Sequence, residues 1–278
     1  MKSLVFSLIM LVSGLISAEI CFPESTLEYS IHDKSSGTIN EFHANQLIKH
    51  FEGIYAPLVK NLTGKEMTIK LDWENPKVNA SATRTMKDDP IVIIFGGMIR
   101  HPEMTRDGVL AVLCHELGHF MGGAPKKKRG TSHKRSWSSA EGQADYFVGA
   151  KCLPYLLKQK IDSTPLFGNE SEIEEILVRC GKDEVCQRTL LAGLSITKVF
   201  ASLKNYYEMP SFHRFDRSEV WETVFGHPEP QCRLDTILAG LNCSDSPLKQ
   251  FDALDPLSSS CYNKDGSRPR CWFSPESF

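Results

Sequence analysis

The spacing of apolar residues predicts helices near the start of the chain and in its second half. Between Asn40 and Leu62 the apolar positions recur at helical spacing, which predicts an amphipathic helix. The pattern from Glu170 to Asn205 is also mostly helical and is interrupted around Gly181. The apolar positions of the first helix are Phe42, Leu47, Ile48, Phe51, Tyr55 and Leu58.

Extended segments follow the first helix. Met67 to Trp73 alternates between polar and apolar residues, which predicts a strand, and Asn75-Pro76 ends it. Val78 to Met86 is expected to be a second extended segment. Ile91 to Phe95 is short and wholly apolar, as expected for a buried strand.

A buried helix is predicted to begin at Thr105. Asp107 falls in its first turn, where negative charge is favourable, and Gly122-Gly123 followed by Pro125 ends it. Its apolar residues cover more than one face, so we expect it inside the protein. They are Val109, Leu110, Val112, Leu113, Leu117 and Phe120.

The stretch from Lys126 to Arg135 contains six basic residues and no acidic one. We interpret it as a solvated, mobile loop, and a loop that contacts an anion or a substrate is the alternative. Ser138 is then expected to begin another helix, with Glu141 three residues later as in a capping box. This helix is predicted to reach about Leu157, with a kink at Pro154.

The first residues are typical of a secretory signal peptide. Lys2 precedes an apolar run from Leu4 to Ile16, and small residues follow up to Ala18. The run is too short to span a bilayer comfortably. We therefore predict a signal peptide over residues 1–18 and a periplasmic or secreted protein. An uncleaved anchor is the alternative, because Ile16 is an imperfect residue three places before the cut.

The cysteines support an oxidising compartment. All nine follow the predicted cut, and an odd number leaves at least one thiol unpaired. Proximity along the chain suggests the pairs Cys180–Cys186, Cys232–Cys243 and Cys261–Cys271, with Cys114 as the free thiol in an apolar helix. We expect residues 19–248 to form the main domain and 249–278 a cysteine-containing tail rich in Ser, Pro and Asp.

Size and charge exclude some classes of function. The chain has 278 residues, which suits one large domain with a small appendage. Its net charge of −2 argues against a nucleic-acid partner. After the first residues, no segment is apolar enough to cross a membrane.

The segment His115-Glu116-Leu117-Gly118-His119 carries the clearest chemistry. Two histidines four residues apart lie on one face of a helix, so both imidazoles reach one metal ion. Zinc prefers such nitrogen ligands. Glu116, beside the first histidine, is placed to act as general base toward a zinc-activated water.

A third ligand is expected from a later helix. One class of zinc peptidase places a third histidine six residues after the second, but that position is Pro125. Another class uses a glutamate followed four residues later by an aspartate. Glu141 and Asp145 meet that spacing, with Asp145 accepting a hydrogen bond from a ligand histidine. The sequence therefore predicts a zinc site of His115, His119 and Glu141, with one Zn2+ per chain.

The chain resembles the M48 family of gluzincin peptidases. Besides the two zinc motifs, His227-Pro228 followed by Arg233 is similar to a late His-Pro and Arg in that family. The segment Asn79, Ala80, Ser81 and Ala82 resembles its upstream Asn-Ala-x-Ala segment. The resemblance covers roughly residues 40 to 240 and leaves the tail without a counterpart.

The resemblance implies an α+β fold, mainly helical, with a small sheet whose edge strand lies beside the active-site helix. Asn79 to Ala82 would form that strand and bind an extended substrate by strand addition. His227 would stabilise the oxyanion or close the site as an extra zinc ligand. Arg233 would pair with acidic groups around the ligands. Family members embedded in membranes have several spanning helices, so a prenylated substrate is not expected here.

Together these features predict an exported zinc endopeptidase that cleaves extended or unfolded protein segments. A zinc-containing binding or chaperone-like protein, with its site closed by His227, is the main alternative. A processing enzyme for a single partner is a further one. Glu116 favours the enzyme, because a scaffold has no need of a base there.

Overall fold

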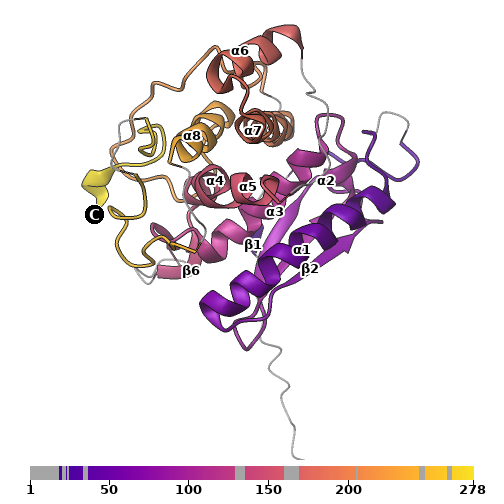
Figure 1. Ribbon diagram of the computed structural model, residues 1–278, viewed down its shortest axis with the longest axis horizontal. Coiled ribbons are helices and arrows are strands. Elements are labelled where there is room, and N and C mark those ends of the chain that lie inside the picture. The colour runs from indigo at the N-terminus through magenta and orange to yellow at the C-terminus, as the bar shows by residue number, and fades with distance from the viewer. Residues whose placement is uncertain are drawn as a thin grey trace, which may run out of the picture.

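The computed structural model describes residues 19–20, 23, 25–33, 37–128, 135–159, 169–204, 206–243, 248–261 and 265–278. The predicted signal peptide, Cys21 and the middle of the basic stretch lie outside these residues. Figure 1 shows a small sheet beside the long helix α1 (Glu41–Thr63), and the helices of the second half of the chain gathered on the far side of α3 (Arg106–Met121). The α+β prediction, mainly helical with a small sheet, is confirmed.

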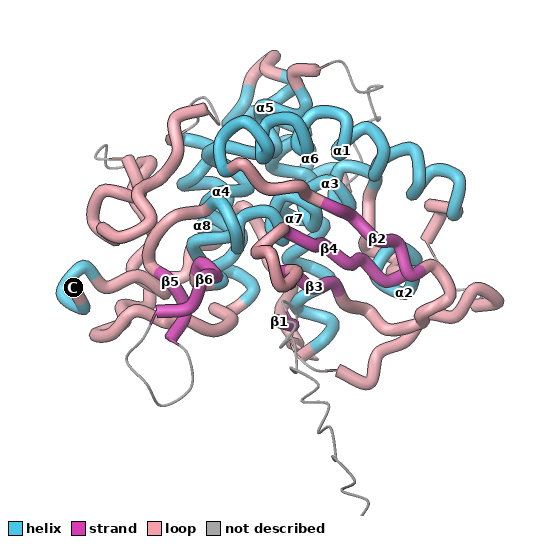
Figure 2. The backbone as a smooth tube through the Cα atoms, turned by 90° about the horizontal axis from the view of Figure 1, so that it is seen from below, coloured by secondary structure: helices cyan, strands magenta, loops and turns pink. Residues whose placement is uncertain are grey.

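The main sheet has the strand order β1-β3-β4-β2. Its strands are β1 (Glu19–Ile20), β2 (Thr68–Asp72), β3 (Ala80–Arg84) and β4 (Pro90–Phe95). β4 pairs in parallel with β2 and antiparallel with β3. The three strands β2, β3 and β4 lie within or beside the predicted extended segments, and Figure 2 shows them side by side.

Two helices pack against this sheet. α1 (Glu41–Thr63) contacts β2, and α3 (Arg106–Met121) contacts β3, β4 and α1. Asn40 caps α1 by accepting a hydrogen bond from the His43 amide at 2.9 Å, and Thr105 caps α3 in the same way through the Gly108 amide. The helix predicted from the apolar period is thus confirmed as α1, and the helix predicted to begin at Thr105 is confirmed as α3. The short α2 (Gly96–Arg100) follows β4 directly.

The helix expected from Ser138 begins later. Ser138 lies in β6 (Arg135–Ser139), which pairs with β5 (Lys126–Lys128). α4 (Glu141–Phe147) starts at Glu141, and its N-cap, Ala140, makes no side-chain capping bond. The capping-box prediction is wrong because the hairpin continues to Ala140, whose amide donates to the Pro125 carbonyl at 2.9 Å.

The rest of the helical body follows the predicted pattern. α4 continues through a π-helical segment, η1 (Val148–Cys152), into α5 (Leu153–Leu157). α6 (Glu170–Cys180) and α7 (Glu184–Leu203) are separated at Gly181, as expected. α8 (Pro230–Asn242) packs on α4 and α7, and a short 3-10 turn, η2 (Pro275–Ser277), lies near the end.

Asp107 lies in the first turn of α3, as predicted, and also pairs with a second helix. Its buried carboxylate accepts two hydrogen bonds of 2.8 Å from Arg188 on α7. This pair joins α3 to α7, so the charge acts across the helix interface rather than only on its own helix end.

The described residues contain four disulfides, and two of the three predicted pairs are wrong. Cys180–Cys186 is confirmed. The tail cysteines instead reach back to α8 and the residue after it, as Cys232–Cys271 and Cys243–Cys261. Cys114 is not free, since it bonds to Cys152 and joins α3 to η1. Proximity along the chain failed because the tail runs antiparallel to α8. Its first cysteine, Cys261, meets the end of the helix, and its second, Cys271, meets the start.

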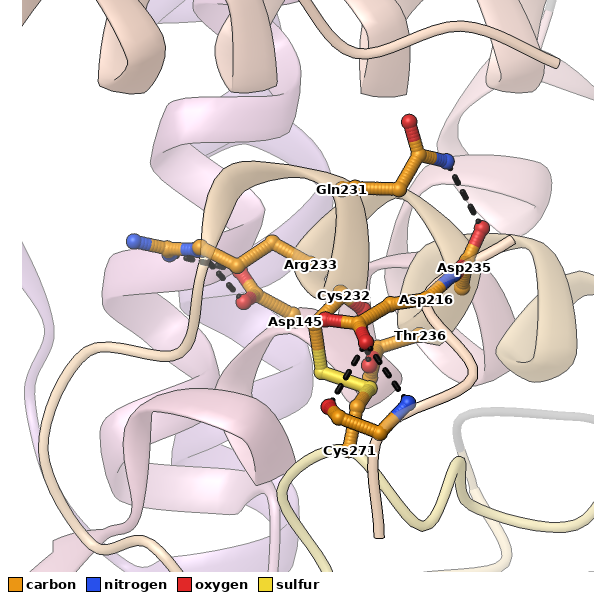
Figure 3. The surroundings of a disulfide bond; sticks show 9 residues. Asp145, Asp216, Gln231, Cys232, Arg233, Asp235, Thr236 and Cys271 are labelled. Atoms are coloured by element: carbon orange, nitrogen blue, oxygen red, sulfur yellow. Dashed lines mark hydrogen bonds and ion pairs between the residues drawn. A yellow bond between two sulfur atoms is a disulfide. The ribbon is translucent and has the colours of Figure 1, made fainter. Parts of the chain in front are cut away.

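The residues after 248 pack on the helical body. Trp272 is fully buried beside Gly142 of α4, and the neighbouring Cys271 is bonded to Cys232 of α8 (Figure 3). The tail therefore covers the helix that carries Glu141. None of the helices in the described part of the chain has the length and apolar character needed to cross a bilayer.

This close contact makes a prediction for Gly142. A Cβ atom there would lie 2.3 Å from Trp272 Cδ2, so Gly142→Ala should lower the free energy of unfolding by about 1–3 kcal/mol. Gly53 in α1 is the control, because its Cβ would meet nothing within 4 Å and Gly53→Ala should stabilise by about 0.5–1 kcal/mol. Urea unfolding followed by circular dichroism measures both. Equal midpoints for the two variants would contradict the packing.

Candidate metal centre

Two helices bring the three predicted ligands together inside the protein. His115 and His119 lie one turn apart on α3, and their ring centroids are 4.9 Å apart. Glu141 is the first residue of α4, which packs across α3. All three side chains are fully buried, and one ligand atom from each lies within 4.8 Å of the others. A metal ion is therefore within reach of all three.

Each glutamate oxygen faces one of the histidines. Glu141 Oε2 lies 3.1 Å from His115 Nε2, and Oε1 lies 3.7 Å from His119 Nε2. His115 Nε2 and Glu141 Oε2 are within hydrogen-bond distance, so a proton on that nitrogen lies between them. A metal ion at the same place would replace that proton, which is the usual competition at a histidine site.

The tautomer of His119 fits metal binding. Its Nδ1 lies 3.0 Å from the Ser139 carbonyl oxygen, which accepts only, so Nδ1 carries the proton. Nε2 therefore presents a lone pair toward Glu141. This atom is buried and has no hydrogen-bond partner among the described residues. Two imidazole nitrogens and one carboxylate are the donor set of many catalytic zinc sites, so the residues fit zinc.

Asp145 fixes the other histidine. His115 Nδ1 donates to Asp145 Oδ1 at 2.8 Å, which leaves His115 Nε2 to face the metal position. Arg233 on α8 donates two hydrogen bonds of 2.7 Å to the same carboxylate (Figure 3). Its guanidinium carbon lies 3.3 Å from the centroid of the Phe200 ring. Asp145 and Arg233, the predicted neighbours of the ligands, thus meet His115 in one buried network.

The network sets the charge of each group. Burial alone would lower the pKa of His115, but the carboxylates of Asp145 and Glu141 outweigh burial and raise this pKa to about 9. Burial lowers the pKa of His119 to about 3. Burial would raise the pKa of Glu141, but His119 and Lys127 hold it well below its usual value.

Glu116 and His227 lie close to these ligands. Glu116 is fully buried and adjoins His115 on α3. His227 Nε2 lies 3.7 Å from Glu141 Oε1, with a quarter of its side chain exposed, 24%. His227 thus comes near the ligands from a segment more than a hundred residues after the zinc helix, which leaves its two predicted roles open.

Lys127 is a neighbour that the sequence did not predict. Its Nζ donates to Glu141 Oε1 at 2.8 Å from β5. The basic stretch was expected to be a solvated loop, but in an extended strand every second side chain turns toward the body of the protein. Two backbone carbonyls also contact site residues: that of Ser139 accepts from His119, and that of Phe225 accepts from the Glu141 amide. The sequence could not predict these contacts, because every residue has the same backbone groups.

The predicted substrate strand lies beside the site but is not an edge. β3 starts at Ala80, just after Asn79, and contacts α3. Its outer side is covered where Ser81 pairs with Ile20 and Ala82 with Glu19 of β1. The edge-strand prediction needs this correction, because pairing with a distant N-terminal segment leaves no local sequence signal.

A second group of metal-binding residue types is not a metal site. Asp216, Cys232 and Cys271 lie together, but the two sulfurs are bonded to each other (Figure 3). A disulfide sulfur is not a thiolate and does not bind zinc in this way.

The pKa of His115 makes zinc affinity depend on pH. Zinc must displace the proton that His115 holds below about pH 9, whereas His119, with a pKa of about 3, is already neutral. Affinity should therefore rise roughly tenfold per pH unit from about pH 6 to pH 8 and fall as pH falls. Competition with a chromophoric chelator at fixed ionic strength measures it. Affinity that is flat over this range would contradict the protonated His115.

Asp145→Asn provides the matched control for this measurement. It keeps the shape of the side chain but removes the charge that raises the pKa of His115. Zinc affinity should fall about 10–100-fold, and its pH dependence should shift to lower pH.

Comparison with known proteins gives one partial relative. No protein-family model matches the chain, and no solved structure matches it. A segment of 51 residues is 39% identical to the protease HtpX of Vibrio vulnificus, covering 18% of this chain and 17% of that protein. The chain therefore aligns with less than a fifth of the relative's length. In this segment and in its buried His115, His119 and Glu141 cluster, the chain is similar to the M48 gluzincin peptidases.

Proposed function

We propose that the protein is an exported zinc endopeptidase that cleaves extended or unfolded protein segments. The observation that carries the proposal is the buried cluster of His115, His119 and Glu141 with Glu116 beside it on α3. The partial similarity to a protease supports hydrolysis of a peptide bond.

The ligands are oriented as a catalytic metal requires. His115, His119 and Glu141 would hold a zinc ion, which would supply Lewis acidity and lower the pKa of a water molecule to about 7. His115 is oriented by Asp145, and His119 by the Ser139 carbonyl. Arg233 keeps Asp145 ionised, since it offsets the burial that would otherwise raise the pKa of that carboxyl.

Glu116 then handles the proton. As general base it takes a proton from the attacking water, and as general acid it returns the proton to the leaving amine nitrogen. Its position next to His115 on the same helix and its full burial support this role.

The substrate is proposed to bind as an extended strand along β3, at Asn79 to Ala82. The contact of β3 with α3 supports this position. Because β1 pairs with only Ser81 and Ala82, a substrate strand would have to displace two residues of the chain. Export is supported by the four disulfides, which persist in oxidising compartments.

A zinc-containing binding protein with a closed site remains a second candidate. The distance of 3.7 Å between His227 Nε2 and Glu141 Oε1 favours it, because an imidazole so close to a ligand oxygen is within reach of the metal. The two candidates differ in what the loss of Glu116 and of His227 does to activity.

Glu116→Gln separates hydrolysis from metal binding. The amide keeps the shape but takes no proton, so hydrolysis of unfolded casein should fall by about 10²–10⁴-fold while one zinc per chain remains. Chelation of zinc should abolish wild-type hydrolysis, and Glu66→Gln on the surface is the control. Normal turnover by Glu116→Gln would remove Glu116 as the base, and no wild-type hydrolysis in the presence of zinc would favour the binding protein.

His227→Ala distinguishes an oxyanion donor from a cap. Loss of a donor should lower turnover at saturating casein about 10²–10³-fold with unchanged zinc content, and this is the expected result. A rise in activity would instead show that His227 closes the resting site. His213→Ala is the control, because His213 is a surface residue with about half of its side chain exposed, 53%.

A further inference from the structure

The hairpin β5–β6 and the C-terminal tail enclose a pocket next to the metal centre. Its volume is about 240 Å3, below the roughly 300–1,000 Å3 of typical small-molecule sites, so it suits a single side chain. Three basic residues of the hairpin line it: Lys126, Lys128 and Arg135. Glu222 is the acidic residue in its lining, so the pocket has an excess of positive charge.

The pocket opens beside the residues that hold the metal. Phe225 lines it, and the Phe225 carbonyl accepts a hydrogen bond of 3.4 Å from the Glu141 amide. Lys126 also lines it and donates to Ser139 Oγ at 3.1 Å, while the Ser139 carbonyl holds His119. The pocket lining is therefore one hydrogen bond away from Glu141 and two hydrogen bonds away from His119.

Strand geometry divides the lysines between the two sites. Lys127 turns inward to Glu141, whereas its neighbours Lys126 and Lys128 line the pocket. Lys128 and Arg135 have no carboxylate partner among the described residues. Lys128 Nζ lies 5.0 Å from the Phe225 ring, and Arg135 donates to the Leu254 carbonyl at 2.6 Å. Both charges thus face the pocket, and no carboxylate of the described residues is paired with either of them.

We propose that this pocket is a specificity subsite that binds an acidic side chain, aspartate or glutamate, of the peptide substrate. A carboxylate there would meet the ammonium of Lys128 and the guanidinium of Arg135, and the Phe225 ring would pack against its aliphatic part. The inference rests on the proposed function, because it assigns the peptide that the metal centre would cleave.

Binding is measured apart from cleavage, so that failure of either idea is visible. The ligand is a fluorescein-labelled nonapeptide of alanine, leucine and glycine with one central glutamate, compared with its glutamine counterpart. Fluorescence anisotropy is recorded with the zinc-loaded full-length Glu116→Gln variant, which holds peptides without turnover. Casein hydrolysis by the wild type reports on the proposed function, whereas the peptide comparison reports on the subsite alone.

The glutamate peptide should bind about fivefold more tightly than the glutamine peptide, and Lys128→Met should remove most of this preference. Lys182→Met, at the exposed turn between α6 and α7, should leave it unchanged. With Lys128→Glu, a peptide with central lysine should become the better ligand. Equal binding of the two peptides, or a preference that survives Lys128→Met, would overturn the subsite.

Salt provides a test that needs no change in the hairpin. Raising sodium chloride from about 0.05 M to about 0.5 M should reduce the preference of Glu116→Gln for the glutamate peptide, because charges near the surface are screened. A preference that does not change with salt would contradict an electrostatic subsite.

Discussion

The buried pairing of Asp145 with Arg233 and His115 is the interaction on which the rest of the structure depends. Three helices contribute one group each: α3 gives His115, α4 gives Asp145 and α8 gives Arg233. A buried charge that loses its partner costs several kcal/mol, so the three helices are constrained to meet at this point. The metal ligands inherit their orientation from this constraint, because Asp145 fixes His115 and shares its helix with Glu141.

The tail and two disulfides hold the same three helices, α3, α4 and α8, from outside this buried network. Cys232 lies next to Arg233 on α8 and is bonded to Cys271 (Figure 3). The neighbouring Trp272 fills the space beside Gly142, the residue after Glu141. Cys114–Cys152 joins the zinc helix to η1 in the same way. Cross-links between distant segments stabilise chiefly by restricting the unfolded chain, so they hold the site's helices together without taking part in its chemistry.

Charge near the metal centre is arranged in two layers. Inside, Lys127 contacts Glu141, and Arg233 contacts Asp145, so that buried carboxylates stay ionised. Outside, Lys128 and Arg135 of the same hairpin face a pocket. The basic stretch that was interpreted as a solvated loop is thus partly a strand, and its alternation gives adjacent lysines different roles.

The sequence by itself determined the features that depend on local spacing. The helical period predicted α1, and the apolar pattern after Thr105 predicted α3. Four-residue spacing predicted His115 with His119, and the spacing of Glu141 and Asp145 predicted the helix that completes the cluster. Such patterns involve residues within one or two turns of each other, so local backbone geometry decides them.

Only the tertiary structure decided the features that join distant segments. Ser138 is a capping type by sequence, but hairpin pairing with β5 makes it part of a strand. The partners of Cys114, Cys232 and Cys243, the cover of β1 on β3 and the contact of Lys127 with Glu141 all depend on how helices and strands pack. These contacts form because apolar faces are buried and buried charges are paired between distant parts of the fold. No local pattern along the chain predicts which distant segments will meet.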